Sequence, residues 1–131
     1  MSALGEAIAG EEAALYAYGL CGSRLFGADR DRALGGLAAH RARVLQLRDL
    51  AGAASIAGTP GGYDIAPPAG EAGARALLAD VESRLAATYS DLAAATSGDE
   101  RTNAALAACE CEVRAIGWGG DPEAFPGHPT D

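Results

Sequence analysis

The amino-acid sequence predicts an all-α fold, a four-helix bundle in which two antiparallel helical hairpins are joined by one long crossover loop. Three observations support this prediction. Alanine and glycine are abundant while β-branched residues are few, a mixture that favours closely packed helices over a sheet. Apolar residues recur with helical spacing in four stretches. A glycine- and proline-rich segment divides those stretches into two pairs, and the 131 residues suffice for a single domain.

The first hairpin is predicted to consist of helices over residues 3–26 and 30–50. In the first of these, apolar residues follow alternating steps of three and four, and Glu11 occupies one position of the stripe. Gly27 begins the break between the two helices. In the second helix His40 lies on the apolar stripe, with an apolar residue about one turn away on either side. We therefore expect both ionisable side chains to point into the core.

The connection over residues 52–70 is predicted to be a crossover loop. Its Gly-Thr-Pro-Gly-Gly and Pro-Pro sequences are incompatible with a continuous helix. Fully extended, a segment of this length reaches roughly 60 Å, about twice the length of a 20-residue helix. The loop can therefore carry the chain from one end of the bundle to the other, so that the third helix runs parallel to the second.

The third helix is predicted over residues 71–96, and its apolar stripe includes Glu82. Ser97 and Glu100 have the spacing of a capping box, in which the serine caps the next helix and the glutamate binds back to the serine N–H. The second turn is therefore expected to be short, and the third and fourth helices are expected to form an antiparallel hairpin.

The fourth helix is predicted over residues 99–117, with Glu110 beside its apolar stripe. Trp118 is expected to seal the end of the bundle, and residues 118–131 form a C-terminal tail that contains His128 as a solvated residue. The predicted core stripe of this helix consists of three large apolar residues and one cysteine: Leu106, Cys109, Val113 and Ile116.

The composition excludes several functional classes. A formal net charge of −8 argues against binding to nucleic acid or to an anionic membrane surface. No apolar run approaches the length needed to cross a bilayer, and the first residues lack the pattern of a signal peptide. The cysteines are odd in number, and Cys109 and Cys111 point to nearly opposite sides of one helix, so they are poorly placed to pair. These features predict a cytoplasmic protein with reduced thiols.

Several segments resemble a known family. The run Glu11-Glu12-Ala13-Ala14-Leu15-Tyr16-Ala17-Tyr18-Gly19 resembles the first-helix signature of an uncharacterised ferritin-like domain family found in actinobacteria, which usually reads Glu-His where this chain has Glu11-Glu12. Residues 39–43 are similar to its second-helix signature, and Trp118 with residues 124–127 is similar to its C-terminal signature. The resemblance covers nearly the whole chain and implies a ferritin-like four-helix bundle, without implying any reaction.

The wider ferritin-like superfamily provides a test for a metal site. Its di-iron members place one Glu on each of two helices and a Glu-x-x-His motif on each of the other two. The matching positions hold Leu37 and Val113 here, so each paired motif lacks one member. The remaining donors cannot form a symmetric two-metal site, but they could hold a single iron or manganese ion, with Glu112 as a stand-in ligand. The candidate metal ligands are Glu11, His40, Glu82 and Glu110.

A second interpretation treats the same residues as a satisfied polar network. His40 would hydrogen-bond to Tyr18, while Arg114 would neutralise Glu82 and Glu110 through charge-assisted hydrogen bonds. Neither interpretation accounts well for a carboxylate at position 11, which must reach an arginine, take up a proton or bind a ligand. We prefer the network because a half-complete ligand set predicts weak or unselective metal binding.

The level of each residue along the hairpin also bears on this choice. In an antiparallel hairpin, residues equidistant from the turn lie side by side. Counting from a turn at Ala28 places His40 level with Tyr16, about five residues from Glu11. That offset is roughly 7–8 Å, which weighs against a metal shared by the two side chains.

The sequence therefore predicts a binding or interaction module with an incomplete metal site, acting through a homodimer built on alanine-rich helix faces. Its protein or small-molecule partner is unknown. The alternative function is that of a carboxylate-ligated iron or manganese oxidoreductase of the ferritin-like superfamily. No spacing typical of a nucleophilic triad and no phosphate-binding loop accompanies these residues, so whether the protein is an enzyme is left open.

Overall fold

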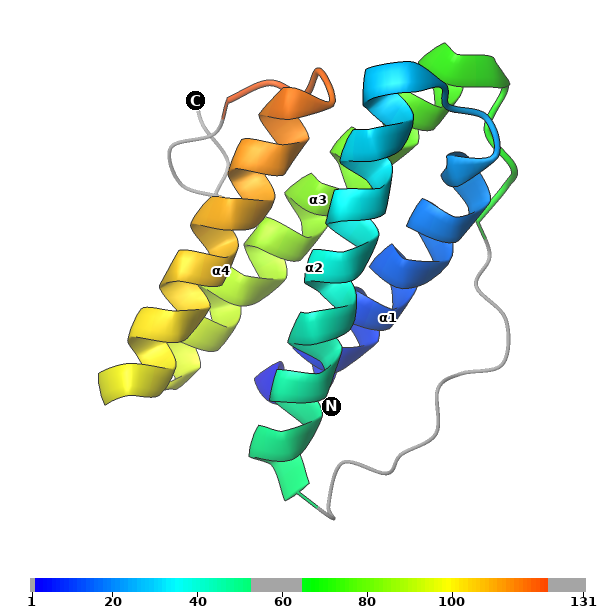
Figure 1. Ribbon diagram of the computed structural model, residues 1–131. Helices are drawn as coiled ribbons and strands as arrows, with labels where there is room; N and C mark the ends of the chain where they lie inside the picture. The colour runs from blue at the N-terminus through cyan, green and yellow to red at the C-terminus, as the bar shows by residue number, and fades with distance from the viewer. Residues whose placement is uncertain (1, 53–64, 123–131) are drawn as a thin grey trace.

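The computed structural model describes residues 2–52 and 65–122, which contain four α-helices and no strand. The helices are α1 (Ala3–Gly22), α2 (Gly27–Ala51), α3 (Gly70–Ala95) and α4 (Gly98–Gly117) (Figure 1). Helices α1 and α2 form one antiparallel hairpin, and α3 and α4 form another. The end of α2 and the start of α3 lie at opposite ends of the molecule, so that α3 runs parallel to α2. The predicted all-α fold of four helices is thus confirmed.

The predicted loop over residues 52–70 and the predicted tail fall largely on residues 53–64 and 123–131, which lie outside the described part of the chain. Within the described part, no helix combines the length and the apolar character that a membrane crossing requires.

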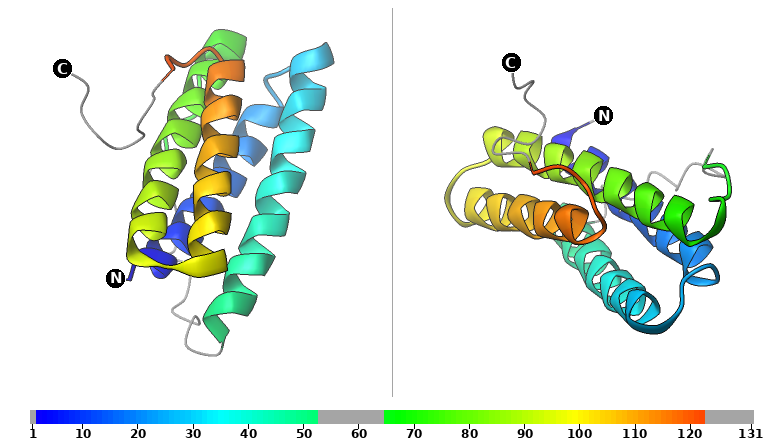
Figure 2. Two further views of the ribbon diagram at one scale, coloured as in Figure 1. Left: turned by 90° about the vertical axis from the view of Figure 1, so that its left-hand side faces the viewer. Right: turned by 90° about the horizontal axis from the view of Figure 1, so that it is seen from above.

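The four helices pack in the order α2, α1, α3, α4, and α2 and α4 face each other across a more open seam (Figure 2). Long arginine side chains from α2 bridge this seam. Arg43 Nη2 donates to Glu110 Oε2 at 2.8 Å, and Arg32 Nη1 donates to the Gly117 carbonyl oxygen at 2.7 Å. Polar contacts therefore connect two helices that share little apolar packing.

The turn between α1 and α2 lies earlier in the chain than the sequence predicts. Because α1 ends at Gly22 and α2 begins at Gly27, the turn is centred between residues 24 and 25 instead of at Ala28. Gly27 has a φ of 57°, a conformation that glycine adopts without strain. Each position of this shift moves the level partner of a residue by two, so His40 lies level with residue 9, within two positions of Glu11. The predicted five-residue offset between these two side chains was wrong for this reason.

The predicted core stripes of the first three helices are largely buried, but that of α4 was wrong. The inner face of α4 consists mainly of small residues, with one glutamate, and its large aliphatic residues face outward: Val113, for example, is 68% exposed. Small side chains let α4 approach α3 closely, since the distance between two helix axes depends on the side chains at the contact. The buried residues are Ala104, Ala107, Ala108, Cys111, Glu112 and Ala115, while Leu106, Cys109, Val113 and Ile116 are exposed.

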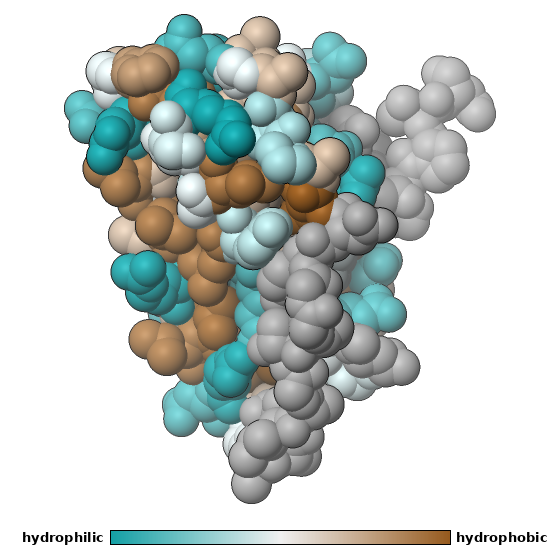
Figure 3. All heavy atoms as spheres, turned by 90° about the vertical axis from the view of Figure 1, so that its right-hand side faces the viewer, coloured by the Kyte–Doolittle hydropathy of each residue, from teal (hydrophilic) through white to brown (hydrophobic). Residues whose placement is uncertain are grey.

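Apolar side chains also reach the surface elsewhere. On the side of the molecule where α1 and α2 lie, they form a band between polar groups (Figure 3). Phe26, Leu34 and Leu45 are exposed large apolar residues of α2 and its N-cap. The molecule therefore carries apolar groups on the outer faces of both α2 and α4.

Gly36 of α2 lies directly against the ring of Tyr18. A Cβ atom at position 36 would lie 2.5 Å from Tyr18 Cε1 and 2.7 Å from Tyr18 Cζ, well inside the normal separation of packed carbon atoms. We expect Gly36→Ala to lower the free energy of unfolding by about 1–3 kcal/mol, because the Tyr18 ring is buried and held in place. Urea denaturation measures the change.

The neighbouring variant Gly35→Ala is the matched control. Its added methyl group would meet no heavy atom within 4 Å, and loss of a glycine from a helix interior should raise stability by up to about 1 kcal/mol. Opposite signs for the two variants are expected; the same sign and size for both would show that the contact with Tyr18 is unimportant.

Candidate functional site

Three of the four residues predicted as metal ligands meet in the core. Glu11 from α1, His40 from α2 and Glu82 from α3 are each 0% exposed. His40 Nδ1 lies 2.6 Å from Glu11 Oε2 with hydrogen-bond geometry. His40 Nε2 lies 2.6 Å from Glu82 Oε1, an ion-pair distance. The imidazole ring thus bridges two carboxylates, one at each nitrogen, and joins three helices.

The Glu82 carboxylate has further partners. Tyr18 Oη donates to Glu82 Oε2 at 3.2 Å, and Arg114 Nε donates to the same oxygen at 2.7 Å. Trp118 Nε1 in turn donates to Tyr18 Oη at 3.0 Å, and Trp118 is buried at the end of α4. The predicted contact between Arg114 and Glu82 is therefore present, whereas Tyr18, the predicted hydrogen-bond partner of His40, donates to Glu82 instead.

The Glu11 carboxylate is satisfied from both sides. Tyr89 Oη donates to Glu11 Oε1 at 2.5 Å, and His40 occupies the other oxygen. This role of Tyr89 was not predicted from the sequence, although Tyr89 lies seven residues after Glu82 on the same apolar stripe. We use the term buried network for the connected set Glu11, His40, Glu82, Tyr18, Tyr89, Arg114 and Trp118.

Two cationic groups match the two carboxyl groups of the buried network. Burial alone would lower the pKa of His40, but the bonds to Glu11 and Glu82 outweigh burial and raise this pKa to about 9. The imidazole is therefore protonated at neutral pH. Burial likewise acts to lower the pKa of Arg114, and Glu82 outweighs it, so that this pKa is raised. Buried charges are tolerated when they are paired in this way.

The two tyrosines remain hydrogen-bond donors. Burial, and then the neighbouring carboxylate, raises the pKa of Tyr18 beside Glu82 and the pKa of Tyr89 beside Glu11. Neither hydroxyl group therefore loses its proton near neutral pH.

Glu110 lies apart from the buried network. Its side chain is 52% exposed and forms an ion pair with Arg43, so the predicted neutralisation of Glu110 by Arg114 was wrong. His40 contacts Tyr18 through their rings, whose centroids are 5.3 Å apart, and not through a hydrogen bond between the two side chains. The site thus contains three of the four predicted residues, from α1, α2 and α3.

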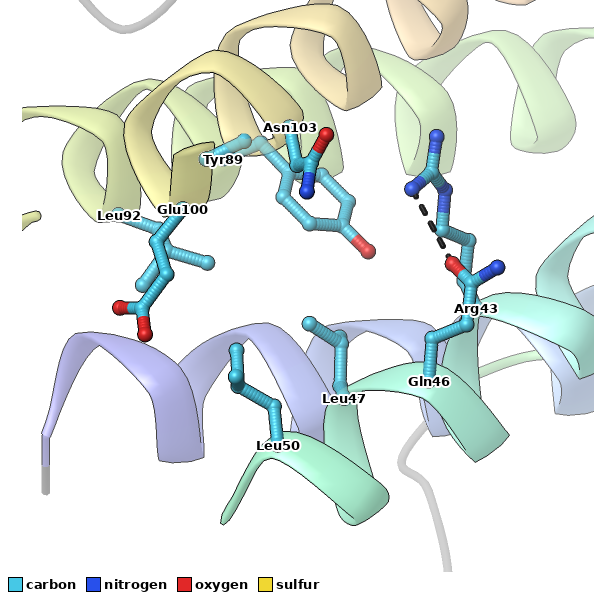
Figure 4. Close-up of a pocket in the computed structure, with 9 residues that line it drawn as sticks. Arg43, Gln46, Leu47, Leu50, Tyr89, Leu92, Glu100 and Asn103 are labelled. Carbon is cyan, nitrogen blue, oxygen red and sulfur yellow. Dashed lines mark hydrogen bonds between the residues drawn. The ribbon is translucent and has the colours of Figure 1, made fainter. Parts of the chain in front are cut away.

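A cavity of about 330 Å³ lies between α2, α3 and α4, next to the buried network (Figure 4). We call it the α2–α4 pocket. Leu47, Leu50 and Leu92 provide apolar walls, and polar groups from α2 and α4 surround them. The Tyr89 ring points between the helices, so its hydroxyl group reaches the pocket as well as Glu11. One side chain therefore belongs to both the pocket and the buried network.

A second cavity of about 380 Å³ lies near the turn of the first hairpin and is lined by Tyr18 and Leu37, among other residues of α1 and α2. Tyr18 is the hydrogen-bond donor at the Glu82 side of the buried network. The network thus extends through the core from one cavity to the other.

Comparison with known protein families matches residues 3–130 to a domain of unknown function (DUF4439). The chain belongs to this family. An uncharacterised domain family is also what the segment at residues 11–19 predicts. No curated protein and no solved structure matches the chain.

The residues of this DUF4439 domain do not fit a two-metal centre. The two carboxylates lie at opposite nitrogens of the His40 ring, so the three groups do not converge on one point. Arg114 places a fixed positive charge against Glu82, where a second cation would be repelled. Within residues 2–52 and 65–122, no group of three or more His, Cys, Asp or Glu residues is arranged to hold a metal ion. The predicted single-ion site stays a prediction.

Proposed function

We propose that this DUF4439 domain is a small-molecule-binding module that uses the α2–α4 pocket. The buried network fixes the positions of the surrounding helices without requiring a metal ion. The observation that carries the proposal is a cavity of about 330 Å³ whose lining includes Tyr89, the terminal donor of the buried network. A ligand in the pocket is thereby placed against a side chain that the core holds rigidly.

The composition of the pocket supports this function. Small-molecule sites are concave, mostly apolar and provided with a few fixed polar groups, and the α2–α4 pocket combines three leucines with amide, carboxylate and hydroxyl groups. Its volume of about 330 Å³ lies at the lower end of the range for small-molecule pockets, which suits a small ligand. The pocket also lies between helices, a common position for such sites in bundles.

A pocket-filling substitution tests this function. Asn103 points into the cavity from α4 (Figure 4), so Asn103→Trp should fill it. In a fragment screen followed by amide NMR shifts, we expect ligands that perturb the 43–50 and 100–104 segments, and we expect Asn103→Trp to abolish those shifts. The control Ala105→Trp changes an exposed neighbour that does not line the pocket and should leave binding intact. Fragments that bind Asn103→Trp as well as the wild type would refute the proposal.

The alternative function remains a ferritin-like iron or manganese oxidoreductase. It is supported by the meeting of Glu11, His40 and Glu82 in a fully buried site and by the tyrosines beside them. Metal analysis of protein produced with both metals provides the test: the network interpretation predicts no stoichiometric iron or manganese, whereas retention that depends on Glu11 would favour the oxidoreductase.

The homodimer also stays a prediction. Of the alanines of α4, only Ala105 is exposed and the others lie in the core, so this helix does not present the alanine-rich dimer face expected from the sequence.

A further inference from the structure

We infer that the ligand of the α2–α4 pocket is a small organic cation, namely a primary amine with a short apolar body. This inference rests on the proposed function, because it specifies which class of molecule the pocket accepts. An amine fits because some polar groups around the pocket already form hydrogen bonds or ion pairs within the protein, while others can still bind a ligand.

Glu100 is the first of these groups. Its position at the start of α4 predicts a capping box with Ser97, but the Ser97 side chain makes no capping hydrogen bond. The Glu100 side chain instead extends along the pocket toward Leu50 (Figure 4). It is exposed and has no hydrogen bond or ion pair with any residue that the structure describes. One wall of the pocket therefore carries a carboxylate that forms no hydrogen bond or ion pair with another described side chain.

The positive charge at the other end of the pocket is already used. Arg43 Nη2 donates to Glu110 Oε2 at 2.8 Å, and Arg43 Nη1 donates to Gln46 Oε1 at 3.3 Å. The guanidinium group is thus neutralised by a carboxylate outside the pocket lining. An anionic ligand would have to displace Glu110 and would also face Glu100, so the pocket disfavours anions.

Tyr89 contributes an acceptor. Its only hydroxyl proton is donated to Glu11, so the lone pairs of Tyr89 Oη are what it can offer to a ligand. Together with the Glu100 carboxylate and the adaptable amide of Asn103, the groups that can bind a ligand are mainly acceptors. An ammonium group has three N–H donors and no acceptor. It complements this set, and the leucines accommodate an apolar body beside it.

The overall charge of the chain favours the same class. A formal net charge of −8 raises the local concentration of small cations at the surface and lowers that of anions. The volume of about 330 Å³ admits an amine carrying one aromatic ring or a short alkyl chain.

Three probes of similar shape and different charge test the inference: 2-phenylethylammonium, 2-phenylethanol and 3-phenylpropanoate. Binding to the full chain is followed by amide NMR titration. We expect the ammonium compound to bind at least about tenfold more tightly than the alcohol, as expected for a hydrogen bond to a charged group, and the carboxylate compound to bind most weakly. Glu100→Gln should reduce ammonium binding about tenfold and leave alcohol binding unchanged.

Glu71→Gln is the matched control, because Glu71 is also an exposed carboxylate in the first turn of a helix, at the opposite end of α3 from Tyr89. It should leave ammonium binding unchanged, and an equal loss in both variants would overturn the inference by showing a general charge effect. Failure of the wild type to bind the ammonium probe would overturn it too. Tighter binding of the alcohol or the carboxylate compound, blocked by Asn103→Trp, would overturn the amine class and leave the proposed function standing.

Discussion

His40→Leu should lower the free energy of unfolding by about 3–5 kcal/mol, the cost of leaving buried charges without their partner. Leucine fills a similar volume but removes the cation between Glu11 and Glu82. In the wild type these two fully buried carboxylates each lie 2.6 Å from one nitrogen of the His40 ring. For a chain of this length the loss corresponds to a decrease of roughly 10–20 °C in Tm. Urea denaturation and thermal melting followed by circular dichroism provide the measurement.

A second substitution separates the loss of charge pairing from a packing defect. In the double variant Glu11→Leu, His40→Leu, one of the two stranded carboxylates is removed, Glu82 keeps Arg114 and Tyr18, and the Tyr89 hydroxyl can turn to the pocket that it lines. We therefore expect the double variant to be more stable than His40→Leu alone. If the second change instead lowers stability further, charge pairing is not the origin of the loss.

The stability of the wild-type protein should decrease as the pH rises from 6 to 8. The pKa of His40 is raised from 6.5 to about 9 in the folded protein, so the folded state binds this proton more tightly than the unfolded state. The resulting stabilisation is fully present below pH 6.5 and is lost as the pH rises through 9. We expect a loss of roughly 2 kcal/mol between pH 6 and pH 8, measured by urea denaturation at each pH.

The buried thiols titrate largely outside this pH window. Burial also raises the pKa values of Cys21 and Cys111, and those thiols add a further loss of stability only above about pH 8.5. The variant His40→Leu should show a nearly flat profile between pH 6 and 8, whereas His128→Gln, which changes the other histidine of the chain, should retain the wild-type slope. A wild-type slope in His40→Leu would assign the effect to another group.

The helices and most of the core could be predicted from the sequence because large apolar residues and interruptions mark them clearly in α1, α2 and α3. In α4 the same reasoning chose Leu106, Val113 and Ile116 as the core stripe, and all three are exposed. Alanine carries little hydropathic contrast, so periodicity cannot distinguish an alanine face that packs closely from one that lies in water. Whether an alanine face is packed or exposed depends on the spacing between the helices, which is a property of the tertiary structure.

The candidate site, too, could be predicted only in part from the sequence. Burial of Glu11, His40 and Glu82 follows from their positions on apolar stripes, but their mutual contact depends on where the first turn is centred. The turn lies three to four residues earlier than predicted, so the residue level with His40 is residue 9, close to Glu11, and not Tyr16. The α2–α4 pocket could not be predicted, because it results from the gap between two helices that are distant in sequence and only lightly packed.

Tyr89 belongs both to the α2–α4 pocket and to the buried network. It therefore links ligand binding in the pocket to proton binding at His40. An ammonium ion accepted by Tyr89 Oη would sit one residue away from Glu11 and two from His40 along a continuous hydrogen-bonded path, and its charge would oppose the proton on the imidazole. Linkage is reciprocal: if the bound ammonium ion weakens proton binding at His40, the ammonium ion must itself bind more tightly as the solution becomes more alkaline. The protonation state of the core would then set how the affinity of the α2–α4 pocket varies with pH.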